Sequence, residues 1–325
     1  MNIEKYLTII IPVYNGEKYI QTCVESIGEH EDVQCVFIND GSLDNSGKVL
    51  DELCGHNRAS IEVVHIENNG VSNARNIGLK YAKGKWIMFL DIDDILLPDW
   101  YEIVKDKFES SKDMICFTHI WEYVPNKSKE VFFTSQNARK LVLTTSEMNT
   151  CWAKLYRRKI LEKYNVMFNT SMKYGEDLCF VLDCCSVSNS IEICNKPILF
   201  YRNNPTSAMH NGNIRNRLYD NLTMLNKRLE AVQKQDGDIV SEIYGHHFAA
   251  LTDIMRSVAL SSKKNNINTY FRQIREQEYF NVVMENVDYK SLGVLKKFEF
   301  SLLKRLYIFA PLYFRYKAII YKFIG

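Results

Sequence analysis

The sequence predicts an α/β fold, in which a mostly parallel central sheet carries helices on both faces and a helical C-terminal region follows. Three observations support this prediction. Short apolar runs of strand length alternate with amphipathic helical segments over the first hundred residues. These runs are apolar at almost every position, which is typical of strands buried on both faces. Beyond residue 211 no strong strand pattern remains, and helical spacing continues to the end.

The first hundred residues predict four strands and three helices in alternation. The strands are expected at Leu7–Asn15, Val33–Asp40, Ile61–Ile66 and Lys85–Asp91. The helices are expected at Glu17–Gly28, Leu43–Leu53 and Ser72–Ala82. Each helix can return the chain for parallel pairing, so the carboxyl ends of these strands should meet at one edge of the sheet. Polar clusters follow three of the four strands, and such sheets bind ligands at this edge.

The middle of the chain has a mixed pattern, which sets the expected domain boundaries. Short strands are expected at Met114–Thr118, Glu130–Phe133 and Ser190–Cys194, and a helix is expected after Gly175. We therefore predict one domain over residues 1–210, with halves at 1–113 and 114–210. A helical region should occupy residues 211–325, and it should end in a basic amphipathic tail at 292–325.

Composition limits the class of protein. The 325 residues are 46% hydrophobic and 25% charged with a net charge of +2, which is ordinary for a globular chain. Nine cysteines occur without a CxxC pair, and no secretory signal peptide precedes the first apolar run. These features predict reduced thiols and a cytoplasmic protein. No basic stripe runs along the body of the chain, so nucleic acid is not an expected partner.

The segment FLDIDD concentrates negative charge at the end of the fourth strand. Asp91, Asp93 and Asp94 lie within four residues, and like charges this close repel unless a positive partner is present. In an extended segment, Asp91 and Asp93 point the same way while Ile92 packs behind them. Hard carboxylate oxygens predict Mg²⁺ or Mn²⁺ as that partner. For Asp94 a second interpretation stays open, in which it caps a helix over Leu96–Trp100.

Five motifs carry a resemblance to a known family. In order they are IIIPVYNGEKYI, FINDGSLDNS, NNGVSNARNIGLKYAKGKW, FLDIDD and YGEDLCF. Together they resemble the inverting glycosyltransferases of family 2, which have the Rossmann-like GT-A fold, over about the first 210 residues. The resemblance implies that residues 1–113 bind a nucleotide-sugar, such as a UDP-sugar, and that residues 114–210 face the acceptor. It also implies Mn²⁺ or Mg²⁺ as the cofactor.

The resemblance further implies a set of donor-binding residues. The nucleotide-sugar contacts are Pro12, Val13, Tyr14, Asn15, Asp40, Arg75, Asp91, Ile92, Arg202 and Ser207. Among these, Asp40 is expected to accept a hydrogen bond from uracil, while Asp93 and Asp91 hold the metal. The residues alone leave Asp40 open as an ordinary turn residue and Arg75 as a solvated helix charge. His210 is a weaker candidate for a metal ligand.

Catalytic and acceptor-binding residues come from two later motifs. The resemblance places the catalytic base at Asp177, with Glu176 as the second choice, although acids at a helix start also favour the helix dipole. The base would take a proton from the acceptor hydroxyl, and a single displacement would invert the anomeric carbon. In the segment WAKLYR, Trp152 and Lys154 are the acceptor-binding candidates. Trp152 could equally be a core residue.

The basic tail suggests a partner at the membrane. Its longest charge-free run, Leu306–Phe314, is far shorter than the roughly 20 residues of a membrane span. A helix lying in the lipid headgroup layer fits this pattern, and it would place the protein on the inner face of the cell membrane. The alternative is a helical cap packed on the body or on another subunit, which would permit a homo-oligomer.

The function expected from the sequence is transfer of a sugar to an acceptor hydroxyl on a glycan or lipid-linked glycan, in cell-surface polysaccharide synthesis. Two alternatives remain. One is a catalytically weak or inactive family member that acts as a membrane-bound assembly partner, against which the intact acidic motifs argue. The other is a sugar-nucleotide pyrophosphorylase, which is disfavoured because PVYNGEKY has a single glycine where that class has a glycine-rich phosphate loop.

Overall fold

The computed structural model describes residues 4–55, 60–124, 127–130, 148–202, 223, 224, 227, 239–261 and 266–324. The chain divides into two compact units. The catalytic unit, as we call it below for its motifs, comprises Met1–Met172 and Glu176–Ser207, and the helical unit comprises Lys173–Gly175 and Ala208–Gly325. The boundary predicted from the sequence was residue 210.

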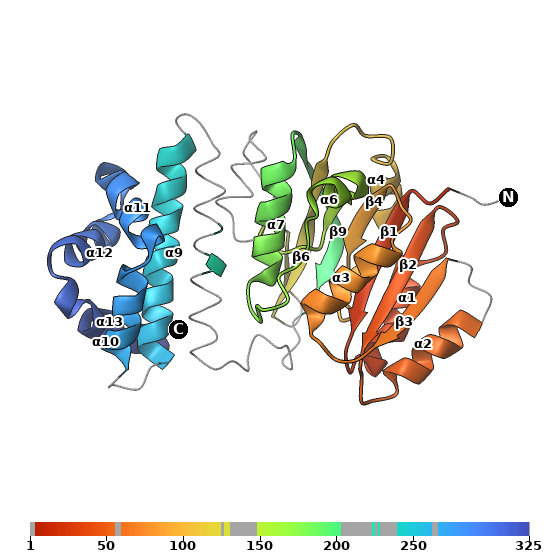
Figure 1. Cartoon of the computed structure of the whole chain (residues 1–325), viewed down its shortest axis with the longest axis horizontal. Helices are drawn as coiled ribbons and strands as arrows, with labels where there is room; N and C mark the ends of the chain where they lie inside the picture. The colour runs from red at the N-terminus through yellow and green to blue at the C-terminus, as the bar shows by residue number, and fades with distance from the viewer. Residues whose placement is uncertain are drawn as a thin grey trace. The chain divides into compact units, whose positions relative to one another are not determined.

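One mixed sheet forms the centre of the catalytic unit (Figure 1). Its strands are β1 (Leu7–Val13), β2 (Val33–Asp40), β3 (Ile61–Ile66), β4 (Trp86–Phe89), β5 (Ile95–Leu96), β6 (Met114–Val124), β7 (Lys127–Glu130), β8 (Lys154–Arg157) and β9 (Ile191–Tyr201). They lie in the order β3-β2-β1-β4-β8-β6-β9-β5, and β7 pairs with β6. The predicted α/β class is confirmed.

The first four strands are parallel, as the alternating pattern predicts. β1 pairs with both β2 and β4, so that Ile9 lies beside Cys35 on one side and Met88 on the other. The other half is mixed, because β8 runs antiparallel to β4 and β6 while β6 and β9 are parallel. Among the described strands, parallel pairing is therefore limited to the first half and to β6–β9.

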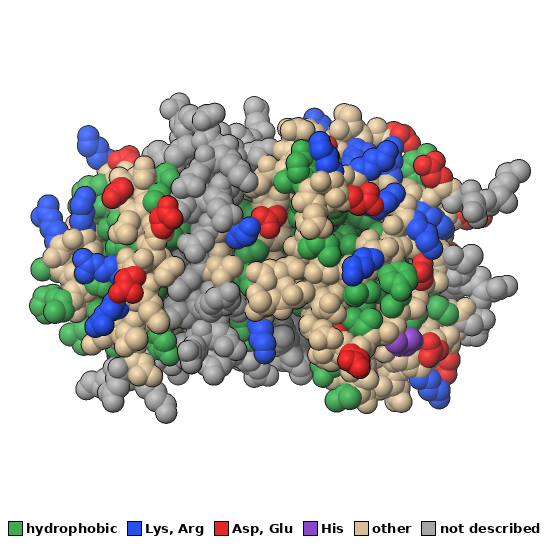
Figure 2. Space-filling model, viewed as in Figure 1, with side chains coloured by type: hydrophobic (Ala, Val, Ile, Leu, Met, Phe, Trp, Pro, Cys, Tyr) green, Lys and Arg blue, Asp and Glu red, His purple; other side chains and the backbone are tan. Residues whose placement is uncertain are grey.

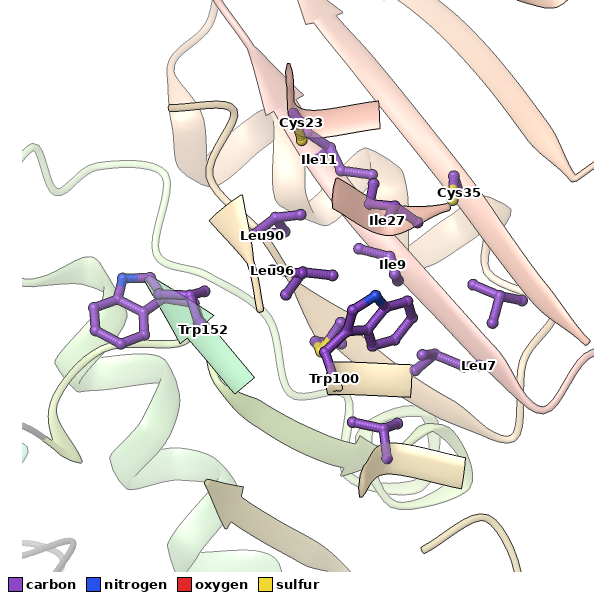
Figure 3. Close-up of a cluster of buried hydrophobic side chains, with 14 of the residues drawn as sticks. Leu7, Ile9, Ile11, Cys23, Ile27, Cys35, Leu90, Leu96, Trp100 and Trp152 are labelled. Atoms are coloured by element: carbon purple, nitrogen blue, oxygen red, sulfur yellow. The ribbon is translucent and has the colours of Figure 1, made fainter. Parts of the chain in front are cut away.

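Helices cover both faces of this sheet. One face packs against α1 (Glu17–Ile27), α2 (Ser46–Gly55) and α4 (Trp100–Lys105). The other packs against α3 (Val71–Tyr81), α6 (Arg158–Tyr164) and α7 (Glu176–Val187). Figure 3 shows the first of these cores, where the Trp100 ring lies beside Leu7 and Ile9 of β1. Each such fully buried aliphatic side chain contributes about 1.5–3 kcal/mol.

The helical unit has a core of its own. Its described elements are α9 (Ile239–Ser261), α10 (Ile267–Arg275), α11 (Glu278–Asn286), η3 (Tyr289–Ser291), α12 (Val294–Arg305), η4 (Tyr307–Phe309) and α13 (Ala310–Ile324). α9 packs against α10, α11 and α13. Phe248, Leu251 and Phe314 are completely buried. Among the residues that the structure describes, no helix is both long and apolar enough to cross a membrane.

Candidate active site

Two loops at the carboxyl edge of the sheet are bonded to each other. The Asn15 amide donates to Ser42 Oγ at 3.0 Å, and the Leu43 amide donates back to Asn15 Oδ1 at 2.8 Å. The Gly16 amide donates to Ser46 Oγ at 2.9 Å. The sequence predicts that this helix begins at Leu43, but α2 begins at Ser46. These bonds explain the difference, because they hold the residues before Ser46 in a loop. They hold the β1–α1 loop beside the β2–α2 loop, with the Tyr14 side chain 50% exposed on it.

Asp40 ties the end of β2 to the start of α3. Its two carboxylate oxygens accept the backbone amides of Asn69 and Gly70, each at 2.9 Å. The next residue, Gly41, has φ +65°, and a Cβ there would lie 2.7 Å from the Asn68 nitrogen. Only glycine fits at this position. Asp40 thus has a structural role in joining the loops. Its hydrogen bond with the uracil ring of a donor stays a prediction.

The acidic segment after β4 differs in two respects from the sequence prediction. It is a turn and not an extended segment, because the Asp94 amide donates to the Asp91 carbonyl oxygen at 3.0 Å. Asp94 does not cap a helix: Ile95–Leu96 is strand β5, paired with β9, and α4 begins at Trp100. Instead, Asp94 is 1% exposed and accepts the Arg202 amide at 3.1 Å. Its other oxygen, Oδ2, has no hydrogen-bond partner within the described part of the chain. Burial and the neighbouring acids raise the pKa of Asp94 well above its ordinary value.

A buried arginine lies at the centre of the carboxylates. Arg75 is 3% exposed; its Nη2 donates to Asp91 Oδ1 at 2.8 Å, and its Nη1 donates to Asp177 Oδ1 at 2.6 Å. Nη1 also lies 3.4 Å from Glu176 Oε1. Burial disfavours the charged guanidinium, but these carboxylates outweigh burial and raise the pKa of Arg75 further. Part of the positive charge that the sequence demanded next to Asp91 is therefore supplied by the chain itself.

A close helix–strand contact positions this arginine. A Cβ at Gly78 of α3 would lie 2.3 Å from Ile10 Cγ2 of β1, so this glycine lets α3 approach the sheet. Arg75 lies one turn earlier on the same helix, and its guanidinium lies 5.2 Å from the centre of the Phe168 ring. This arrangement could not be predicted from local sequence, because the three carboxylate partners of Arg75 are 16 to 102 residues away along the chain.

Glu176 and Asp177 form the first turn of α7. Asp177 makes the shorter ion pair with Arg75, and its Oδ2 also accepts the Cys151 amide at 3.4 Å. Burial and the Asp177 charge raise the pKa of Glu176 to about 7. Two adjacent carboxyl groups in different surroundings are a typical arrangement of acid–base sites. The structure thus brings both candidate bases to the same arginine as Asp91.

The predicted acceptor residues are buried next to this cluster. The Trp152 backbone bridges to Phe89 at the end of β4, and its side chain is 2% exposed. Lys154 is equally buried, and its Nζ donates to the carbonyl oxygens of Thr150 (2.6 Å) and Trp152 (3.3 Å). These contacts favour a supporting role over direct contact with an acceptor. Sequence reasoning missed Trp121, which is half-buried and packs against Tyr201 with ring centres 4.6 Å apart.

The remaining donor-site predictions fall in different places. Pro12 and Val13 are buried in β1, and Ile92 packs on the β1–α1 loop near Gly16. The Arg202 guanidinium lies 5.5 Å from the centre of the Tyr19 ring of α1. Ser207 and His210 lie outside the described residues.

The carboxylate oxygens near Asp91 supply only part of the coordination that a metal ion needs. Within the described ranges, no cluster of three His, Cys, Asp or Glu side chains could hold a metal ion. Asp91 already accepts from Arg75, so the chain offers Asp93 and the second oxygen of Asp91. Mg²⁺ is commonly held by one or two carboxylates, with substrate phosphates completing its octahedron. This donor set therefore fits a metal that arrives with a diphosphate.

Comparison with known proteins identifies the class of this domain. Residues 8–165 match the family model described as glycosyl transferase family 2. These residues hold the first four strands, the acidic segment and Arg75. The chain therefore carries a glycosyltransferase family 2 domain.

Curated bacterial relatives agree with this assignment. The uncharacterized glycosyltransferase EpsJ of Bacillus subtilis is 28% identical over 216 residues, which are 62% of this chain and 62% of EpsJ. A teichoic acid poly(glycerol phosphate) polymerase of Staphylococcus epidermidis is 30% identical over 205 residues, covering 60% of this chain and 28% of the polymerase. The match thus spans less than two thirds of these relatives.

Solved structures share the fold. S. aureus TarS 1-349 superposes with a TM-score of 0.71 at 18% identity, covering 98% of this chain and 92% of that chain. TarS has also been crystallised with UDP-GlcNAc. The mannosyltransferase PcManGT of Pyrobaculum calidifontis, in complex with GDP-Man and Mn²⁺, has a TM-score of 0.53 at 12% identity, covering 86% and 83% of the two chains. These likenesses confirm the predicted GT-A type of fold.

Proposed function

We propose that this protein is an inverting, metal-dependent glycosyltransferase that moves a sugar from a UDP-sugar to an acceptor hydroxyl. One observation carries the proposal: a single buried guanidinium holds the predicted base Asp177 and the donor-side Asp91 together. The two functions of such an enzyme, donor binding and proton removal, would then lie within one hydrogen-bonded cluster. The TarS complex with UDP-GlcNAc supports a uridine donor.

In the proposed reaction, Asp177 accepts the proton of the acceptor hydroxyl as that oxygen attacks the anomeric carbon. Attack comes from the face opposite the leaving nucleotide, so one displacement inverts the configuration. Arg75 fixes the orientation of Asp177 through the 2.6 Å contact, and the Cys151 amide holds the other carboxylate oxygen. The carboxylate therefore cannot rotate freely, which is the kind of preorganisation that general-base catalysis needs.

On the donor side, the two hydrogen-bonded loops after β1 and β2 would hold the nucleotide. Tyr14, Asn15 and Asp40 would lie nearest to its uracil ring. Asp91 and Asp93 would hold Mn²⁺ or Mg²⁺ together with the diphosphate. When bound, this cation neutralises the negative charge that grows on the leaving group. The PcManGT complex with GDP-Man and Mn²⁺ supports this part of the proposal.

The acceptor is proposed to be a glycan or lipid-linked glycan of a cell-surface polymer. The support is the relation to the teichoic acid polymerase. The half-buried ring of Tyr201 stacks on Trp152 and packs against the ring of Trp121, and together Tyr201 and Trp121 offer an apolar face for a sugar ring. Such an acceptor would bring the enzyme to the inner face of the cell membrane.

The test is a donor screen with a matched pair of variants. Purified protein would be assayed for donor hydrolysis and transfer with UDP-, GDP- and dTDP-sugars, with and without Mn²⁺. We expect Asp177→Asn to keep UDP binding but to lose transfer by about 100-fold or more, the contribution of a general base. Asp183→Asn, on the same helix, should keep wild-type transfer. Wild-type transfer by Asp177→Asn would refute the base assignment, and no turnover with any donor would favour an inactive assembly partner.

A further inference from the structure

The C-terminal helices present two faces of different character. Their inner face is part of the core of the helical unit, where Phe300, Leu303, Phe314 and Ala318 are buried. Their outer face is formed by apolar side chains that face solvent: Val294, Leu295, Phe298, Leu306, Ile308, Phe309, Leu312, Tyr316, Ile319 and Ile320. We call this set the outer apolar face. Soluble proteins rarely expose so many large apolar side chains from consecutive elements.

The spacing of five of these residues places them along one stripe. On α13 the exposed positions are Leu312, Tyr316, Ile319 and Ile320, which recur at helical spacing, and Ile308 of η4 lies one turn before Leu312. Ile308 is 83% exposed and Leu312 is 71% exposed. The stripe is therefore a surface of the folded unit, made by elements whose opposite side is packed.

The charge along this segment has a single sign at the surface. Glu299 is the only acidic residue between Tyr289 and Gly325, and it is completely buried against Lys296 and Lys317. Lys290, Lys304 and Arg305 remain exposed. In Figure 2, blue basic and green apolar side chains lie next to one another along the left edge of the helical unit, with a few red acidic side chains nearby. The one acidic side chain between residues 289 and 325 is thus removed from the surface.

We propose that the outer apolar face docks on an anionic lipid bilayer, with its apolar side chains inserted at the headgroup boundary and the basic side chains on the lipid phosphates. Apolar insertion combined with basic charge is the recognised requirement for such binding. A second copy of this chain fits less well, because it would place basic side chains against basic side chains. The inference rests on the proposed function only in its purpose, namely access to a lipid-linked acceptor, and its test does not require activity.

Point variants test the proposal better than truncation does. Removal of the tail would also remove Phe314, which is completely buried, and would disrupt the helical unit. The variant Ile308→Ser/Leu312→Ser replaces two exposed side chains and leaves the packed face intact. Its matched control, Tyr81→Ser/Tyr164→Ser, replaces two exposed side chains of the catalytic unit, which are 40% and 45% exposed. Circular dichroism melting of the full chain would check that both variants fold.

The measurement is sedimentation of the full chain with vesicles of phosphatidylcholine alone or with one quarter phosphatidylglycerol. Wild type and control should bind the anionic vesicles, and Ile308→Ser/Leu312→Ser should bind at least about tenfold more weakly. Lys304→Gln/Arg305→Gln should lose mainly the preference for phosphatidylglycerol. Equal vesicle binding by the folded apolar variant would overturn the proposal. A second result would also overturn it: wild type does not bind vesicles but forms a dimer in light scattering, and Ile308→Ser/Leu312→Ser is a monomer.

Discussion

At the scale of single residues, the site is organised around one charge. A buried arginine without partners would be strongly destabilising, and so would buried carboxylates without a cation. Arg75 and the acids Asp91 and Asp177 compensate one another, with contacts of 2.8 and 2.6 Å. Only arginine can do this, because its two terminal nitrogens reach two carboxylates in fixed directions. The orientation of the proposed base, Asp177, therefore depends on Arg75, which also holds Asp91 of the predicted donor site.

Glu176 should make the stability of the catalytic unit depend on pH. Burial and Asp177 raise its pKa to about 7 in the folded chain, while in the unfolded chain the pKa is near the ordinary glutamate value of about 4.3. Between these values the folded state binds the proton more tightly. The free energy of unfolding should therefore fall as pH rises from about 4.3 to about 7, by up to about 4 kcal/mol.

Urea unfolding at pH 5 and pH 8 measures this effect. Glu176→Gln cannot ionise, so its loss of stability between the two pH values should be smaller than that of wild type. Glu162→Gln, at an exposed position on α6, is the matched control and should follow wild type. Identical pH dependence in wild type and Glu176→Gln would show that Glu176 does not hold its proton in the folded state.

The residue scale also shows what the sequence could and could not predict about the site. The carboxylates Asp91, Asp177 and Glu176 were named from motifs, and the structure brings them together. Arg75 was named too, but as a contact of the nucleotide, since a motif gives no side-chain direction. The sequence predicts only a metal as the positive partner of Asp91. Counting the charges near Asp91 in the sequence does not reveal that Arg75, on another element, lies beside it in the fold.

At the scale of elements, the approach of α3 to β1 determines where Arg75 lies. An alanine Cβ at Gly78 would overlap Ile10 Cγ2, and Ile10 is completely buried in a central strand. Isoleucine is stiff at χ1, so it cannot swing aside without disturbing its neighbours. We expect Gly78→Ala to destabilise the catalytic unit by about 1–3 kcal/mol, the usual cost of overpacking. It should also lower transfer activity, because the helix that carries Arg75 is displaced.

A double-mutant cycle checks the cause. Ile10→Ala removes the overlapping methyl group and leaves a cavity, so the double variant Gly78→Ala/Ile10→Ala should be more stable than the sum of the single effects predicts. Gly245→Ala on α9 is the matched control, because among the described residues no atom outside the backbone of its own helix lies within 4 Å of its added Cβ. That variant should be neutral or slightly stabilising, as alanine favours helix. Strict additivity in the cycle would contradict the proposed overlap.

Most elements of the first half could be predicted from the sequence because each is specified locally. The strands Val33–Asp40 and Ile61–Ile66 are apolar runs, and their structural bounds agree with the predicted ones. The short strand Ile95–Leu96 is not predicted, and Leu96 is instead expected in a helix over Leu96–Trp100, because the strand pairs with Leu199–Phe200, about 100 positions away. The direction of the strands in the second half could not be predicted for the same reason. An apolar run indicates that a strand is buried, but it does not indicate which strand pairs with it.

At the scale of the whole molecule, two units with separate cores should respond differently to a ligand. The catalytic unit buries Leu7, Ile9 and Phe37, while the helical unit buries Phe248 and Phe314. A ligand stabilises only the unit that binds it, by about 2.7 kcal/mol at one hundred times its dissociation constant. Calorimetry of the full chain should therefore show two transitions, and UDP with Mn²⁺ should raise one of them by about 5–10 °C.

Variants assign the transitions and test the metal. Gly78→Ala should lower the transition that UDP raises, which would assign that transition to the catalytic unit. Asp93→Asn should keep the shift caused by UDP alone but lose the additional shift caused by Mn²⁺, because a carboxylate ligand is replaced by a neutral amide. A Mn²⁺ effect of full size in Asp93→Asn would remove this residue from the metal site. A nucleotide shift shared equally by both transitions would mean that the binding site is not confined to the carboxyl edge of the sheet.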